Sequence, residues 1–143
     1  MIDRQKNNNI EFFIPLKKVP SITAQQKRVT WNHKKNKPIF YDSEKLKDVK
    51  EMFRAHTFKY APKKPFTGPI RLVVKWCYKT KDLKKIGTLK ITKPDTDNLI
   101  KALKDSMTLV GYWKDDAQVA SEINEKYWDY ISGVYIYIQK VEE

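Results

Sequence analysis

Apolar side chains at every second position from residue 70 to residue 78 constrain the fold of this chain most strongly. Five residues share this spacing: Ile70, Leu72, Val74, Trp76 and Tyr78. The basic residues Arg71 and Lys75 stand between them. Successive side chains of a strand point to opposite faces of its sheet, so a period of two is typical of a half-buried strand. The segment therefore predicts a strand from Ile70 to Tyr78.

Two other segments have the period of an amphipathic helix. In the first, from Thr96 to Val110, the apolar stripe consists of Leu99, Ile100, Leu103, Met107 and Val110. Asp95 or Thr96 can cap this helix, and Gly111 ends it. A second helix is expected from about Ser43 to Phe58, where Asp42 or Ser43 can serve as the cap.

The remaining strand signals complete a mixed fold. Residues Ile10 to Ile14 predict a short strand, and the runs 119–127 and 133–141 are expected to pair as a hairpin. The segment from Lys27 to Lys37 is expected to be a loop. We therefore predict an α/β (α+β) fold in one domain, residues 1–143: a single mixed sheet of about four to five strands covered by two main helices.

The chain carries a strong positive charge. Lys and Arg total 29 against 17 Asp and Glu, which gives a formal net charge of +12. Such an excess favours nucleic acid or an anionic membrane as partner, and the plainer alternative is a soluble basic protein. The sequence has no apolar run near the roughly 20 residues of a membrane span, and its start does not resemble a signal peptide. We therefore expect a cytoplasmic protein.

The cysteine and the histidines of this sequence do not indicate a disulfide or a zinc site. Cys77 is the only cysteine, which excludes an internal disulfide and a thiolate zinc site. We expect its side chain to pack as a small apolar group. His33 and His56 lack the paired spacing of zinc ligands.

Basic residues concentrate in two segments that could contact phosphates. In the first, cations surround Trp31, a mixture that suits phosphate contact and base stacking, although a solvated mobile loop would have the same composition. Its candidate DNA-binding residues are Lys27, Arg28, Lys34 and Lys35. The second segment carries six lysines between residues 79 and 93, and its candidates are Lys84, Lys85, Lys90 and Lys93.

The first of two short acidic runs, KPDTDN at residues 93–98, interrupts this basic surface. Asp95 and Asp97 are two residues apart and could share one cation. The alternative is ordinary capping of a helix N-terminus, where the helix dipole favours carboxylates. Lys101 and Asp105 follow at intervals of four, so Asp97, Lys101 and Asp105 lie on one side of the helix. A solvated ladder of ion pairs would have the same spacing.

The second acidic run, WKDDAQV at residues 113–119, adds Asp115 and Asp116. Adjacent side chains face opposite ways, so at most one of this pair should reach the same metal as the first run, and spacing does not choose between them. Three converging carboxylates would suit Mg²⁺ or Mn²⁺, because these hard cations prefer oxygen ligands. We therefore predict that the two runs meet at a common cation beside a basic DNA-binding surface.

The pattern KPDTDNLIKALKDSM followed by GYWKDDAQV resembles the signature of the RusA-type Holliday junction resolvases, small endonucleases of bacteria and their prophages. The close match covers residues 93–119, and the N-terminal half agrees only in general character. The resemblance implies that Asp95, Asp97 and Asp116 are the catalytic metal ligands and that Lys101 is the catalytic lysine. Asp105 and Asp115 also match family positions, and supporting roles are implied for both.

The same resemblance implies the reaction and the assembly. It implies a homodimer that resolves four-way DNA junctions during DNA recombination and repair by nicking two opposed strands. The implied cofactor is Mg²⁺, with Mn²⁺ able to substitute. Two other functions remain open from the residues themselves: a flap or general structure-specific nuclease, and a non-catalytic nucleic-acid-binding module whose aspartates only cap a helix.

Overall fold

The computed structural model describes residues 9–22 and 27–141. Within these residues the strands are β1 (Asn9–Pro15), β2 (Lys27–Asn32), β3 (Lys37–Asp42), β4 (Ile70–Lys79), β5 (Val119–Asp129) and β6 (Gly133–Lys140). The helices are α2 (Glu44–Phe58), α3 (Asp97–Leu109) and the short 3₁₀ helix η2 (Asp116–Gln118).

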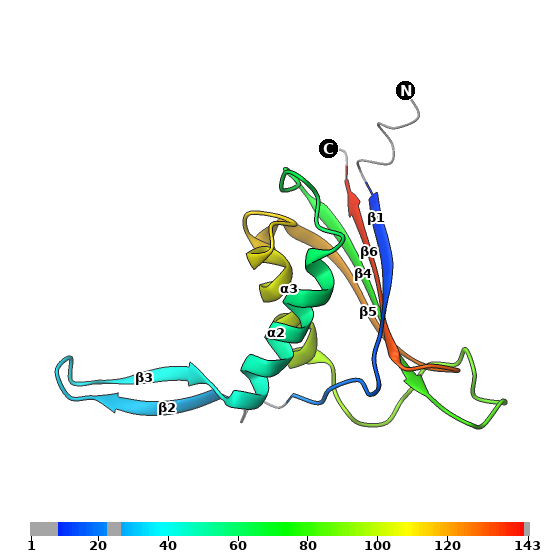
Figure 1. Cartoon of the computed structure of the whole chain (residues 1–143), viewed down its shortest axis with the longest axis horizontal. Coiled ribbons are helices and arrows are strands. Elements are labelled where there is room, and N and C mark those ends of the chain that lie inside the picture. The colour runs from blue at the N-terminus through cyan, green and yellow to red at the C-terminus, as the bar shows by residue number, and fades with distance from the viewer. Residues whose placement is uncertain (1–8, 23–26, 142–143) are drawn as a thin grey trace.

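A mixed sheet with two helices on one face forms the body of the molecule (Figure 1). The strand order is β1-β6-β4-β5, with β4 parallel to β5 and antiparallel to β6. The alternating apolar side chains of β4 are buried against α2 and α3, and the rings of Trp76 and Phe53 lie 6.0 Å apart between the layers. The predicted α/β fold, with one mixed sheet and two main helices, is confirmed.

The predicted hairpin between the last two strands is wrong. β5 and β6 are consecutive in the sequence, yet β4 lies between them and pairs with both. Parallel strands need a crossover connection, and α3 supplies it between β4 and β5. The most apolar strand thereby occupies an interior position of the sheet, where both of its edges are paired.

The predicted loop from Lys27 to Lys37 is also wrong. This segment contains β2, the turn after it and the first residue of β3, and the two strands form a second, two-stranded sheet. β2 and β3 form an antiparallel hairpin that projects from the body beyond α2 (Figure 1). In its turn the Asn32 side chain accepts hydrogen bonds from the amides of Lys34 and Lys35, and Asn36 has a positive φ of 53°. Asn tolerates this left-handed conformation better than most residues, so the turn is encoded locally.

The two long helices begin in different ways. At the start of α2, Ser43 has extended backbone angles (φ −68°, ψ 164°), and its hydroxyl accepts a hydrogen bond from the amide of Leu46. This is the usual geometry of an N-cap. At the start of α3, Thr96 has φ −107° and ψ 5°, and its side chain makes no capping hydrogen bond.

The described residues contain no helix long and apolar enough to cross a membrane.

Candidate active site

A relay of two partly buried hydrogen bonds fixes Thr96, which stands between the two aspartates of the first acidic run. The indole Nε1 of Trp76 in β4 donates to Oδ1 of Asn124 in β5 at 2.7 Å. Nδ2 of Asn124 then donates to the Thr96 hydroxyl at 3.0 Å. Thr96 is buried, whereas Asp95 and Asp97 on either side of it are exposed. The sheet therefore holds this segment while both carboxylates remain available to a ligand.

Two lysines hold the chain immediately before Asp95. Nζ of Lys126 in β5 donates to the carbonyl oxygens of Thr92 at 2.7 Å and Pro94 at 3.0 Å. Nζ of Lys90 donates to the carbonyl oxygens of Thr92 at 3.2 Å and Lys93 at 2.5 Å. Burial and the nearby ammonium groups of Lys126 and Lys85 lower the pKa of Lys90. The Lys90 ammonium therefore binds the carbonyl oxygens of its own loop. Because its side chain is buried, this binding disfavours the predicted contact between Lys90 and a phosphate.

The alternative explanation of the Asp97, Lys101 and Asp105 spacing, a ladder of ion pairs along α3, is not observed among the described residues. Asp105 pairs with Lys50 of α2 at 3.5 Å, which ties the two helices together. Asp95 pairs with Lys93 at 3.2 Å. No ion pair or hydrogen bond joins the side chains of Asp97, Lys101 or Asp116 to another residue within the described ranges. These are three of the residues that the sequence pattern singled out, so capping and surface pairing explain them poorly.

The second acidic run is held by Gln118, a residue that the sequence reasoning missed. Its Oε1 accepts from the amides of Lys114 and Asp115, and its Nε2 donates to the carbonyl oxygens of Phe66 and Gly68. The Asp115 carboxylate accepts from the amide of Ala117 at 2.9 Å, which completes a capping box at the start of η2. Asp115 is therefore occupied by its own turn, and Asp116 is the free member of the pair.

The two acidic runs lie at opposite ends of α3 (Figure 1). Thr96, at the start of the helix, contacts Asn124, while η2 leads into the start of β5 at Val119. Asn124 lies five residues after Val119 in β5, which is about 17 Å along the strand at 3.3 Å per residue. The 13 residues of α3 give a similar span of about 20 Å at 1.5 Å per residue.

One chain therefore does not assemble the predicted three-carboxylate site. Among the described residues, no three Asp, Glu, His or Cys side chains are grouped so that they could hold a metal ion. The prediction that Asp95, Asp97 and Asp116 meet within one chain is wrong, because the rigid helix between the runs keeps them apart. Sequence spacing did not reveal this, since the turn after Gly111 could have folded back toward either end of α3.

Five candidate phosphate contacts have exposed side chains, and one of them, Lys93, pairs with Asp95. Lys34 and Lys35 lie at the tip of the β2–β3 hairpin. Lys84 and Lys85 lie in the loop after β4, where Lys85 Nζ stands 5.2 Å from the ring centre of Trp128. The side chains of Lys27 and Arg28 fall outside the described part of the structure.

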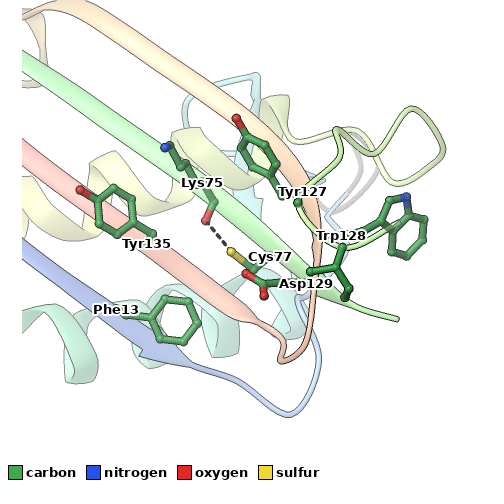
Figure 2. A pocket seen from close by; sticks show the side chains of 9 residues that line it. Phe13, Lys75, Cys77, Tyr127, Trp128, Asp129 and Tyr135 are labelled. Atoms are coloured by element: carbon green, nitrogen blue, oxygen red, sulfur yellow. Dashed lines mark hydrogen bonds between the residues drawn. The ribbon is translucent and has the colours of Figure 1, made fainter. Parts of the chain in front are cut away.

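A hollow of about 450 Å³ opens on the sheet face opposite the helices (Figure 2). Lys75 Nζ lies there 5.7 Å from the ring centre of Tyr127 and 5.5 Å from that of Tyr135. Burial and the neighbouring Asp129 carboxylate raise the pKa of the Cys77 thiol to about 11. The thiol therefore stays protonated near neutral pH, and its expected packing as a small buried group is confirmed.

Comparison with known proteins connects the acidic runs to a nuclease family. The model of the family described as "Endodeoxyribonuclease RusA" matches residues 19–139, a range that contains both acidic runs and Lys101. The crossover junction endodeoxyribonuclease rusA of Lactococcus phage r1t is 34% identical over 122 residues, which cover 81% of this chain and 89% of that protein. The chain therefore belongs to the RusA family of endodeoxyribonucleases.

Proposed function

We propose that this endodeoxyribonuclease resolves four-way DNA junctions as a homodimer, by Mg²⁺-dependent nicking of two opposed strands. The observation that carries the proposal is the set of charges without a described partner: Asp97, Lys101 and Asp116. They occur on the family pattern within a strongly basic chain. Carboxylates on such a surface would repel DNA unless a divalent cation neutralised them.

The donor set fits Mg²⁺ in chemistry but is incomplete in one chain. Asp95 and Asp97 offer exposed carboxylate oxygens, the ligand type that Mg²⁺ and Mn²⁺ prefer. Mg²⁺ is commonly bound through one or two carboxylates together with substrate phosphates and water. Asp95 and Asp97 can therefore supply two of the ligands of a Mg²⁺ ion. If Asp116 is also a ligand, it must belong to another copy of the chain.

A second copy of the chain can supply Asp116. A two-fold axis that crosses α3 near its middle exchanges the two ends of the helix. Asp116 of the partner subunit would then approach Asp95 and Asp97 of the first chain, and the reverse contact would build an equivalent second site. This arrangement brings Asp116 to the end of α3 that carries Asp97 and Lys101, from which a single chain keeps it apart. It also gives two sites with the symmetry of a four-way junction.

Each of these residues has a distinct role in the proposed reaction. The three aspartates hold the cation, and Lys101 offsets the negative charge that develops on the attacked phosphate or orients the attacking water. Bound Mg²⁺ supplies charge neutralisation and makes water a better nucleophile at neutral pH. The relay through Asn124 and the ammonium groups of Lys90 and Lys126 hold the first acidic run in place.

Cleavage of a synthetic four-way junction tests the function directly. We expect paired nicks in opposed strands with Mg²⁺ and none when the metal is removed with EDTA. Flapped and linear DNAs of the same length serve as controls. Faster cleavage of the flap would favour the alternative of a general structure-specific nuclease, and metal-independent binding without any cleavage would favour a non-catalytic module.

The basic tip of the β2–β3 hairpin should contribute to the salt dependence of binding. Each neutralised duplex phosphate adds a slope of about −0.9 to log affinity against log salt concentration. Lys34→Ala and Lys35→Ala should therefore each reduce that slope by about one. Lys45→Ala, which removes an exposed lysine from α2, is the matched control. Equal slopes for the hairpin variants and the wild type would remove the hairpin from the DNA interface.

A further inference from the structure

The start of α3 lacks a side-chain capping hydrogen bond, because the N-cap hydroxyl is bonded to the sheet instead. Thr96 occupies the N-cap position, where a threonine hydroxyl normally accepts a hydrogen bond from an amide of the first helical turn. Its hydroxyl accepts instead from Nδ2 of Asn124 at 3.0 Å. Ser43 at the start of α2 shows the ordinary alternative within the same chain: an extended N-cap with a capping hydrogen bond.

The polarity of the relay leaves no other arrangement. An indole N–H can only donate, so the Asn124 side chain must present its oxygen to Trp76 and its amide nitrogen to Thr96. Trp76 is fully buried, so its N–H needs this acceptor. The orientation of Asn124 is therefore set in the core of the sheet and passed outward to the residue between Asp95 and Asp97.

We propose that Asn124 is the positioning residue for the Asp95–Asp97 pair and thereby sets the affinity of the chain for its divalent metal. This inference rests on the proposed function, because it concerns the same metal site. Without Asn124, Thr96 is free to adopt extended angles and cap α3 as Ser43 caps α2. That change rotates the backbone between the two aspartates and moves their carboxylates relative to each other.

Mn²⁺ binding provides a readout separate from cleavage. We expect Asn124→Leu to weaken Mn²⁺ binding to the DNA-free homodimer by about 10-fold or more, measured from the electron paramagnetic resonance signal of free Mn²⁺, because residues that orient metal ligands commonly have effects of about 10–100-fold. Thr96→Val leaves the bond between Trp76 and Asn124 intact and cannot cap α3, but it breaks the same tie between this segment and the sheet, so it should also weaken Mn²⁺ binding. The double variant should be no weaker than the single variants, because all three break one relay.

A second tie between β5 and α3 supplies the matched control. Glu122 pairs with Lys104 at 2.8 Å farther along the helix, so Glu122→Gln also loosens β5 from α3 without touching the relay. It should leave Mn²⁺ affinity within about two-fold of the wild type. A structure of Asn124→Leu should show the Thr96 hydroxyl accepting from the amide of Asn98 or Leu99.

The outcomes separate this inference from the function beneath it. Wild-type Mn²⁺ affinity in folded Thr96→Val and Asn124→Leu proteins would overturn the positioning role while leaving the metal site intact. Equal weakening by Glu122→Gln would overturn it as well, because general docking of α3 would then explain the effect. A wild-type protein that binds no Mn²⁺ would overturn the proposed metal site and this inference with it.

Discussion

Asp97→Asn should reduce cleavage of a four-way junction by at least about 10–100-fold while leaving junction binding unchanged or slightly tighter. The substitution keeps the shape of the side chain but removes the charge that holds the cation, and even residues that only support metal ligands have effects of this size. Binding depends instead on cations that contact phosphates, so loss of a carboxylate should not weaken it. Single-turnover cleavage and gel-shift titration on the same junction measure the two quantities.

Asp105→Asn is the matched control for this prediction. Asp105 lies on the same helix and in the same family pattern, but its carboxylate already pairs with Lys50. The pair is partly exposed, so its loss should cost at most about 1 kcal/mol of stability and leave cleavage near the wild-type rate. Full cleavage by Asp97→Asn, or equal loss with Asp105→Asn, would contradict the assignment of Asp97 as a metal ligand.

A heterodimer of Asp97→Asn and Asp116→Asn chains should regain cleavage that neither homodimer has. If each site takes Asp97 from one chain and Asp116 from the other, one site of the heterodimer carries both substitutions and the other carries none. Dimers bearing two different affinity tags, one on each chain, can be purified for the assay. The product should be a junction nicked in one strand, because only one intact site remains to cut.

The reciprocal heterodimer has the opposite expectation. A wild-type chain paired with an Asp97→Asn, Asp116→Asn double variant has one substitution in each shared site, so it should be inactive. If each site lay within one chain, the same heterodimer would keep one intact site, and the mixed single-variant heterodimer would be dead. The two dimers thus give reversed results under the two arrangements, and activity in the reciprocal one alone would refute the shared site.

The local periods of the sequence were sufficient to predict the main elements. The alternation in β4 and the apolar stripe of α3 identify a strand and a helix within a residue or two of their observed bounds, because burial of one face imposes these periods on any fold. They do not specify which strands pair. The final two strands have hairpin-like spacing, yet β4 lies between them because its parallel pairing with β5 is made by the α3 crossover.

The sequence also proposes candidate residues for the site, but it does not give their arrangement. Charge pattern and family resemblance select Asp95, Asp97, Lys101 and Asp116, since carboxylates in a basic chain suit a metal site on a DNA-binding surface. Lys90 shows what composition cannot predict. The sequence identifies a cation there, but it does not reveal that the residue is buried and that its ammonium donates to a loop carbonyl. Asn124 and Gln118 show it too, because their roles depend on partners 28 to 52 residues away.

Sequence by itself determined which side chains this protein carries: carboxylates in two short runs, a lysine one turn beyond the first run, and an excess of positive charge. Only the tertiary structure decided where those groups stand. A rigid 13-residue helix holds the two acidic runs at its opposite ends, and the sheet beneath it is tied to Thr96 of the first run through partly buried hydrogen bonds. Side-chain types are local properties of a sequence, whereas distances between them arise from the packing of segments that the sequence separates.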